Sequence, residues 1–182
     1  GGTGIGASVV RRLAGRGVSC VINYASSREA AEALAAEVGQ GAIAVQADVA
    51  DDGECRRLAA AACEAFGRID FLVNNAGRTK FAAHEDLEAL TADDFIDVYR
   101  LNLVGAFQMV RACAPALARS GHGAVVNVAS VAGVHGVGSS VAYAASKGAL
   151  ITMTKSLARV LAPEGSGDDA PGKLARCFRR RR

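Results

Sequence analysis

A tyrosine and a lysine stand four positions apart in the run Tyr143-Ala-Ala-Ser-Lys147. Residues at this spacing share one face of a helix, with Cβ atoms about 5–6 Å apart. A free phenol has a pKa near 10, and a nearby ammonium group favours its ionised form. Lowering that pKa by about 3 units needs roughly 4 kcal/mol, which requires a close and partly desolvated cation. A tyrosine tuned in this way can exchange a proton with a carbonyl or alcohol oxygen.

A serine precedes the tyrosine by 13 positions, at the end of an apolar run. Residues 124–129 read A-V-V-N-V-A and are expected to form a buried strand that ends at Ser130. After a glycine-rich loop, the hydroxyl of Ser130 could donate a hydrogen bond to the oxygen that Tyr143 protonates. Tyrosine and lysine also occur at this spacing by chance, as an interfacial tyrosine and a solvated lysine. The chemical interpretation therefore depends on the rest of the chain.

The chain opens with a glycine-rich turn that leads into a helix. Residues 1–6 read G-G-T-G-I-G, and residues 7–14 have the apolar content of a helix. Glycine permits close backbone approach, and the free N–H groups at a helix N-terminus bind anions. We predict a pyrophosphate-binding turn; a flexible glycine-rich terminus is the alternative, because no strand precedes the motif.

The second part of a nucleotide site is expected after the strand at 18–23. In dinucleotide-binding folds an acidic residue at this point accepts hydrogen bonds from the adenosine ribose, but here the sequence continues as Tyr24-Ala-Ser-Ser-Arg28. Ser26, Ser27 and Arg28 suit a 2′-phosphate by hydrogen bonding and charge. The sequence therefore favours NADP(H) over NAD(H). Alternatively, a serine caps the next helix and Arg28 is solvated, and both interpretations can hold together.

Strands and helices are expected to alternate along the chain, which predicts a doubly wound parallel α/β sheet with helices on both faces. Further strands are expected at 42–46 and 69–73, and helices at 28–38, 51–66, 91–119 and 141–161. Asn102 and Gly105 weaken the long helix locally, for which we propose a functional reason. The alternative is an asparagine satisfied by backbone groups.

Composition limits the classes of protein that need to be considered. The chain has 182 residues, 51% hydrophobic and 21% charged, as expected for one globular domain. Its five cysteines are odd in number and lack C-x-x-C spacing, which predicts reduced thiols of a cytoplasmic protein rather than disulfides or a metal site. The net charge of +3 is exceeded by the four arginines 179–182, so no nucleic-acid surface is predicted. No apolar run approaches the length of a membrane span.

Four motifs in this order resemble the short-chain dehydrogenase/reductase family: G-G-T-G-I-G, N-N-A-G at 74–77, Ser130, and Y-A-A-S-K. The resemblance covers residues 1–165 and implies a Rossmann-type fold. It also implies hydride transfer between NADP(H) and a carbonyl or secondary alcohol as small-molecule substrate. The runs I-N-Y-A-S-S-R and S-K-G-A-L are most similar to the 3-oxoacyl-carrier-protein reductase branch.

The resemblance also implies roles for individual residues. Tyr143 would be the catalytic acid/base, Lys147 would lower its pKa and hold the nicotinamide ribose, and Ser130 would polarise the substrate carbonyl. Asn102 would hold a water in a proton relay. The two long helices that carry Asn102 and Tyr143 would pair between subunits of a homodimer or homotetramer. Besides Tyr143 and Lys147, the implied cofactor-binding residues are Thr3, Gly4, Ile5 and Gly6 at the phosphates, Tyr24, Ser26 and Arg28 at the adenosine ribose, Asp48 and Val49 at the adenine, and Asn75, Ala76 and Gly77 along the cleft.

The chain departs from the family pattern at both ends. It begins inside the phosphate-loop motif, so the first strand, which is central in the family's strand order, is expected to be lacking. Its neighbours would then be separated, and each buried unpaired ladder group costs about 1–3 kcal/mol. After residue 165 the pattern of the last strands is lost. We therefore interpret 1–165 as a partial dinucleotide-binding domain and expect 166–182 to be a disordered tail.

Two functional hypotheses remain open from the sequence. The first is an oxidoreductase whose sequence is partial. The second is a truncated, catalytically inactive module that binds nucleotide weakly or pairs with family members. A third, weaker hypothesis assigns the terminal arginines to an anionic polymer, which would require salt-dependent binding. A solvated tail is favoured over it.

Overall fold

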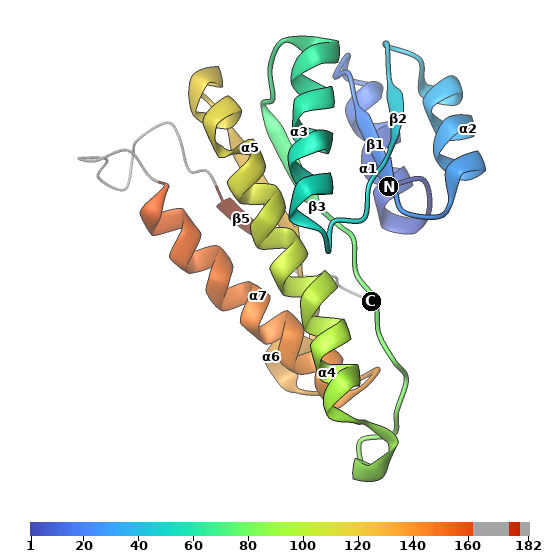
Figure 1. The fold of residues 1–182 in the computed structure, drawn as a ribbon, viewed down its shortest axis with the longest axis vertical. Helices are drawn as coiled ribbons and strands as arrows, with labels where there is room; N and C mark the ends of the chain where they lie inside the picture. The colour runs from blue at the N-terminus through green and yellow to red at the C-terminus, as the bar shows by residue number, and fades with distance from the viewer. Residues whose placement is uncertain (162–174, 179–182) are drawn as a thin grey trace.

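The computed structural model describes residues 1–161 and the strand at 175–178, in which helices alternate with strands (Figure 1). The first half comprises α1 (Gly4–Ala14), β1 (Val21–Tyr24), α2 (Arg28–Val38), β2 (Ile43–Gln46) and α3 (Asp52–Phe66). The second half comprises β3 (Phe71–Asn74), η1 (Leu87–Ala89), α4 (Ala92–Tyr99), η2 (Arg100–Gly105), α5 (Ala106–Ser120), β4 (Ala124–Val128), α6 (Ala132–His135), α7 (Val141–Val160) and β5 (Ala175–Phe178). The predicted alternation is confirmed.

All strand pairings in the described part of the chain are parallel. One sheet has the order β1-β2, with Val21 opposite Ile43, and the other has the order β3-β4-β5, with Phe71 opposite Ala124. Parallel pairing needs crossover connections, which the intervening helices supply. The predicted parallel α/β fold class is confirmed.

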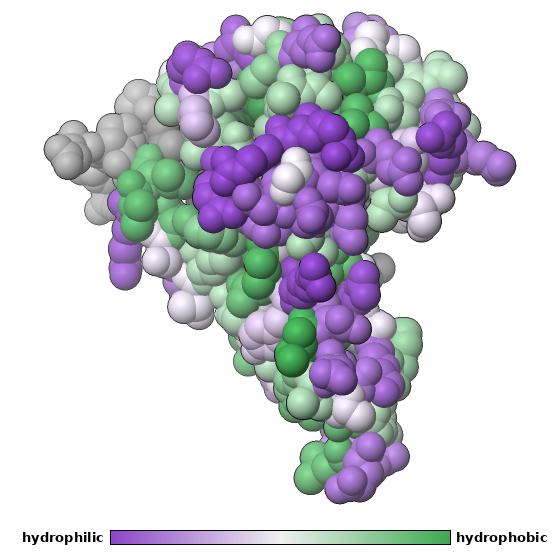
Figure 2. Space-filling model, viewed as in Figure 1, coloured by the Kyte–Doolittle hydropathy of each residue, from purple (hydrophilic) through white to green (hydrophobic). Residues whose placement is uncertain are grey.

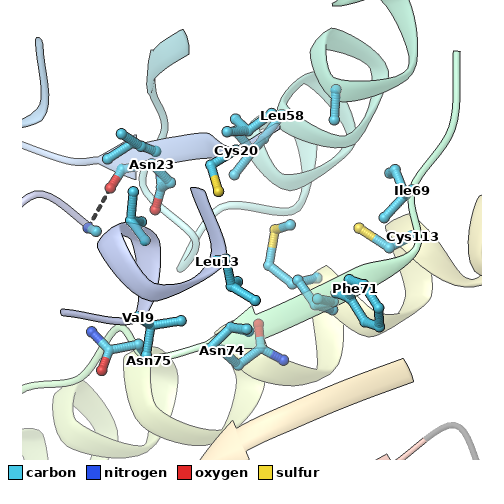
Figure 3. Close-up of a pocket in the computed structure, with 18 of the residues that line it drawn as sticks. Val9, Leu13, Cys20, Asn23, Leu58, Ile69, Phe71, Asn74, Asn75 and Cys113 are labelled. Carbon is cyan, nitrogen blue, oxygen red and sulfur yellow. Dashed lines mark hydrogen bonds between the residues drawn. The ribbon is translucent and has the colours of Figure 1, made fainter. Parts of the chain in front are cut away.

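The two sheets are separated by a cavity of about 810 Å³ between β1 and β3. Figure 3 shows Val9 and Leu13 of α1 on one side, with Cys113 of α5 and Phe71 of β3 on another. The residues that line the cavity are largely apolar, as expected in the interior of a parallel α/β fold, where helices cover both faces of the strands. The predicted separation of β1 and β3, the two expected neighbours of the family's first strand, is confirmed.

The C-terminal segment differs from the sequence prediction at four residues. A tail without regular structure was expected from 166 to 182, whereas residues 175–178 form β5 and pair in parallel with β4. The outer edge of β4 presents backbone N–H and C=O groups, and a neighbouring segment can satisfy them whatever its side chains. The rest of the predicted tail lies outside the described residues.

Two hydrophobic clusters lie on either side of the cavity. One joins α1, β1 and α2 around Ile22 and Leu34, and the other joins α3, α5 and β4 around Leu117 and Val125. Cys113 belongs to the second cluster, and burial raises the pKa of its thiol to about 12. This cysteine is therefore a neutral packing group.

The long helix predicted from 91 to 119 is continuous but has a π-helical turn, η2, at its centre. Thr91 begins it with a capping box, in which the Thr91 side chain accepts from the Asp94 N–H and the Asp94 carboxylate accepts from the Thr91 N–H. Hydrogen bonds from Lys80 and Thr91 hold the pKa of Asp94 at about 2.

The span 92–120 is long and apolar enough to cross a membrane, but half of its most apolar window is buried, as in core helices. The predicted local weakening of the helix near Asn102 is confirmed, because residues 100–105 form a π-helical turn instead of regular α-helix.

A short helix, α6, lies in the glycine-rich loop that was expected after Ser130, and it packs closely on α7. A Cβ atom on Gly133 would lie 2.5 Å from the carbonyl carbon of Lys147 and 2.6 Å from the backbone nitrogen of Gly148. Neither backbone atom can move away without displacing α7. Glycine at position 133 therefore permits the close approach of these two helices.

We expect Gly133→Ala to lower the free energy of unfolding by about 1–3 kcal/mol, because overpacked cores lose stability in this range. Urea denaturation measures the effect. Gly53→Ala is the matched control, because its Cβ would meet one side-chain atom, the Asp51 Oδ1 at 3.2 Å, and no backbone atom, so a shift of a few tenths of an ångström that keeps the Asp51 cap accommodates it. The control should be neutral or slightly stabilising, since alanine favours helix over glycine. Equal loss in both variants would contradict the close-packing argument.

Candidate active site

Tyr143 and Lys147 lie on one face of α7, near its N-terminus. The Ser140 hydroxyl caps this helix by accepting a hydrogen bond from the Tyr143 N–H at 3.3 Å. The ammonium nitrogen of Lys147 stands 5.8 Å from the centre of the Tyr143 ring. The cap fixes the first turn of α7, and the turn fixes the tyrosine relative to the cation.

The ammonium group of Lys147 is buried at the carboxyl end of β4. The residue is 4% exposed, and its Nζ donates a hydrogen bond to the Val128 carbonyl at 2.8 Å. A buried charge is tolerated only where it is hydrogen-bonded or paired. Ser130 follows two residues later, partly exposed, with its Oγ accepting from the Ala132 N–H at 3.2 Å. The end of β4 therefore brings Ser130 to the region that Lys147 occupies.

Asn102 is 1% exposed and points from the π turn toward the loop that follows β3. Its Oδ1 accepts from the Arg78 N–H at 2.8 Å, and its Nδ2 donates to the Arg78 carbonyl at 2.9 Å and to the Ser146 Oγ at 3.0 Å. A π turn inserts one residue into the helix and so re-aims a side chain. Asn102 thus connects the loop after β3 with α7.

The predicted cofactor-cleft residues lie between the phosphate-loop motif and α7 and contact both. A Cβ atom on Gly6 would lie 3.0 Å from the Asn75 Nδ2, and one on Gly77 would lie 3.1 Å from the Asn102 Oδ1 and 3.5 Å from the Lys147 Nζ. The phosphate-loop motif therefore packs on the loop after β3, and that loop packs on Asn102 and Lys147. Figure 3 shows Asn75 beside Val9 of α1.

The N-terminus of α1 has the features of an anion site. Thr3, Gly4 and Ile5 are exposed, and Thr3 occupies the N-cap position without a side-chain capping bond. The first N–H groups of the helix are thus available to a ligand, and the helix dipole favours negative charge there. Gly4 has a φ of 56°, which glycine adopts without strain.

The end of β1 presents a mixed set of side chains. Tyr24 is buried, whereas Ser26 and Arg28 are exposed, and the Nε of Arg28 lies 3.9 Å from the Glu32 carboxylate. Ser27 occupies the N-cap position of α2, but its side chain makes no capping bond, so that alternative prediction is wrong for Ser27. The Arg28 guanidinium is held only by a long surface pair, which is weak.

The loop at Asp48 and Val49 is fixed to the long helix. The Gln108 Nε2 donates to the Val49 carbonyl at 2.9 Å, and the Asp48 carboxylate accepts from the Ala50 N–H at 3.0 Å. Gln108 and Ser146 were not among the predicted site residues. The position of Ser146 inside the Y-A-A-S-K run is the only feature of the sequence that could have indicated it. No sequence pattern indicates Gln108, because its partner Val49 is 59 positions away.

Known proteins match this chain over most of its length. The model of the short chain dehydrogenase family matches residues 1–165. A protein named as a ketoacyl reductase of the granaticin polyketide synthase from Streptomyces violaceoruber is 45% identical over 88% of this chain and 64% of its own length. The 3-oxoacyl-[acyl-carrier-protein] reductase FabG of Staphylococcus aureus is 38% identical over 89% of this chain and 66% of its own length.

Solved structures show the same fold. A short-chain dehydrogenase/reductase from Burkholderia xenovorans has a TM-score of 0.84 at 42% identity, covering 89% of this chain and 69% of that one. An NAD⁺-bound xylitol dehydrogenase has a TM-score of 0.82 at 36% identity, covering 89% of this chain and 62% of that one. The chain spans slightly less than two thirds of the length of the two curated relatives. It belongs to the short-chain dehydrogenase/reductase family.

Proposed function

We propose that this chain forms the nucleotide-binding and catalytic part of an NADP(H)-dependent oxidoreductase that interconverts a carbonyl compound and a secondary alcohol. The family consists of oxidoreductases that bind a nicotinamide cofactor. The observation that carries the proposal is the buried ammonium of Lys147, which donates to Val128 and stands 5.8 Å from the Tyr143 ring.

The catalytic step rests on the electrostatics of this pair. Lys147 places a positive charge, largely removed from water, beside the ring of Tyr143, so that cation and phenol act on the same substrate oxygen. Tyr143 then gives a proton to the carbonyl oxygen of the substrate, or takes one from the alcohol. Ser130 donates a hydrogen bond to the same oxygen. When bound, the cofactor supplies or accepts the hydride.

The residues present fit a dinucleotide. The open N-terminus of α1 suits its pyrophosphate, and the missing side chain of Gly6 lets the phosphate loop approach Asn75. Ser26 and Arg28 are exposed at the end of β1, where no acidic residue stands, and they would bind the 2′-phosphate. We propose that the enzyme acts in the cytoplasm and that its substrate is a small molecule. The names of the ketoacyl reductase relatives make a 3-oxoacyl compound the first substrate class to test.

A second candidate function is a binding module without turnover. The division of the sheet favours it, because β1 and β3 lie in different sheets, and among residues 1–161 and 175–178 no ladder hydrogen bonds join the nucleotide half to the catalytic half. In this case the chain would bind NADPH, or pair with a family member, without reducing any carbonyl compound. A measurement of turnover beside cofactor binding separates the two functions.

We expect Tyr143→Phe to lower carbonyl reduction at least about 100-fold, because general acid–base catalysis contributes about 10²–10⁴-fold. The dissociation constant for NADPH should change by less than about twofold, since the phenol is only one of many cofactor contacts. The absorbance of NADPH measures turnover, and its fluorescence measures the dissociation constant. Tyr99→Phe is the control and should be silent. Retained turnover in Tyr143→Phe would exclude the proton-transfer role.

We expect Arg28→Ala to weaken NADPH binding about tenfold to hundredfold, because hydrogen bonds to charged groups contribute about 1.5–3 kcal/mol. NADH binding should be almost unchanged, since NADH lacks the 2′-phosphate. Titration calorimetry with both cofactors measures the ratio, and Arg16→Ala is the control for loss of a surface charge. Equal losses for NADPH and NADH would refute the 2′-phosphate assignment.

We further propose that the long helices pair between subunits. Ile96, Val104 and Phe107 are 61%, 43% and 40% exposed along this segment. Figure 2 shows apolar green atoms among hydrophilic ones where Figure 1 draws α4 and α5. We expect Phe107→Glu to shift a dimer or tetramer toward monomer in sedimentation velocity. A wild-type monomer at micromolar concentration would contradict this proposal.

A further inference from the structure

The hydroxyl of Ser146 joins two segments that are distant in the sequence. It is fully buried, donates to the Tyr143 carbonyl at 2.8 Å, and accepts from the Asn102 Nδ2 at 3.0 Å. A carbonyl oxygen can only accept, so the one hydroxyl proton points at Tyr143 and a lone pair faces Asn102. The single proton and one of the two lone pairs of this hydroxyl are therefore used.

The connection continues from Asn102 to the loop after β3. The asparagine amide accepts from the Arg78 N–H and donates to the Arg78 carbonyl. A flipped amide would set donor against donor at the N–H and acceptor against acceptor at the carbonyl, so only one orientation satisfies Arg78. The same orientation directs an amide proton at Ser146.

The connected residues span the proposed site. Arg78 directly follows the cofactor-cleft residues Asn75–Gly77, and Tyr143 begins the turn that ends at Lys147. Gly77 also lies against both the Asn102 amide and the Lys147 ammonium, where an added Cβ would lie only 3.1 Å from the amide oxygen. The distance between the cleft loop and the first turn of α7 is therefore set by the chain of bonds through Asn102 and Ser146.

We propose that Ser146 is a positioning residue that fixes the cofactor-cleft loop relative to the Tyr143–Lys147 turn. Its catalytic consequence rests on the proposed function, whereas the connection itself does not. A misplacement of about 1 Å can cost about 10²-fold in rate. A hydrogen bond that holds both segments at once is therefore worth more to turnover than to stability.

Ser120 provides a matched control from the same molecule. Its hydroxyl also donates to the carbonyl three residues earlier, that of Leu117, at 2.8 Å, and also accepts, from the His122 N–H at 3.4 Å. Both of these contacts are local to the end of α5 and remote from the cleft loop. Ser120 therefore represents a serine whose hydroxyl makes only local contacts at a helix end, whereas Ser146 represents one that bridges two elements.

The first experiment measures amide hydrogen exchange at Arg78 in the 182-residue chain. We expect Ser146→Ala to accelerate exchange of the Arg78 N–H about fivefold, because its acceptor Asn102 loses a fixed partner. Ser146→Cys, which keeps a weak donor and acceptor of similar size, should give a smaller acceleration. Ser120→Ala should leave Arg78 unchanged. Exchange in β4, on which α7 packs, reports whether each variant remains folded around position 146. Unchanged exchange at Arg78 in a folded Ser146→Ala chain overturns the proposal.

The second experiment measures turnover and separates this proposal from the proposed function. In an active wild type, Ser146→Ala should lower kcat about tenfold or more, with KM and the NADPH dissociation constant within about twofold. Unchanged kcat overturns the positioning role, even if exchange at Arg78 rises. If the wild type has no turnover, the proposed function fails, and the exchange experiment alone decides whether Ser146 positions the loop.

Discussion

The arrangement of the site depends on one buried charge, the ammonium group of Lys147. Removing an ammonium from water costs several kcal/mol unless polar groups replace its hydration. The carbonyl of Val128 supplies one such group, and the Tyr143 ring lies over the cation. Since Val128 ends β4 and Lys147 lies in the second turn of α7, satisfying this charge requires that the carboxyl end of the strand meet the first turns of the helix. Gly133 permits the meeting, because α6 can then press on the backbone of Lys147.

A second constraint is the π turn in the long helix. A regular α-helix through residues 100–105 would direct Asn102 elsewhere, whereas the inserted residue aims its amide at Arg78 and Ser146. Close packing supports the turn, since a side chain on Gly105 would lie 2.9 Å from the Val49 carbonyl. The same helix thus holds the cleft loop through Asn102 and the loop at Val49 through Gln108.

The two sheets divide the site in two. The α1, β1 and α2 cluster carries the phosphate loop and the side chains proposed to bind the adenosine ribose, and the other cluster lies beneath β4 and the loop after β3. β1 and β3 lie in different sheets, so the two parts meet through side-chain packing, where Val21 of β1 and Val45 of β2 lie against the second cluster, and through the close approach of Gly6 to Asn75. Side-chain and loop contacts are less rigid than a ladder of backbone hydrogen bonds. The position of the phosphate loop relative to Tyr143 therefore depends on these contacts.

The sequence by itself determined the features that arise from local interactions. These include the helix predicted at 51–66 and observed at Asp52–Phe66, the alternation of strands and helices, and the shared face of Tyr143 and Lys147. Only the tertiary structure decided which acceptor holds Lys147, that α6 exists, that β5 pairs with β4, and that Ser146 bridges to Asn102. The partners in that bridge lie 44 positions apart, and those in the Asn102–Arg78 pair lie 24 apart. Local propensity and spacing carry no information about such pairs, because they form only when packing brings the elements together.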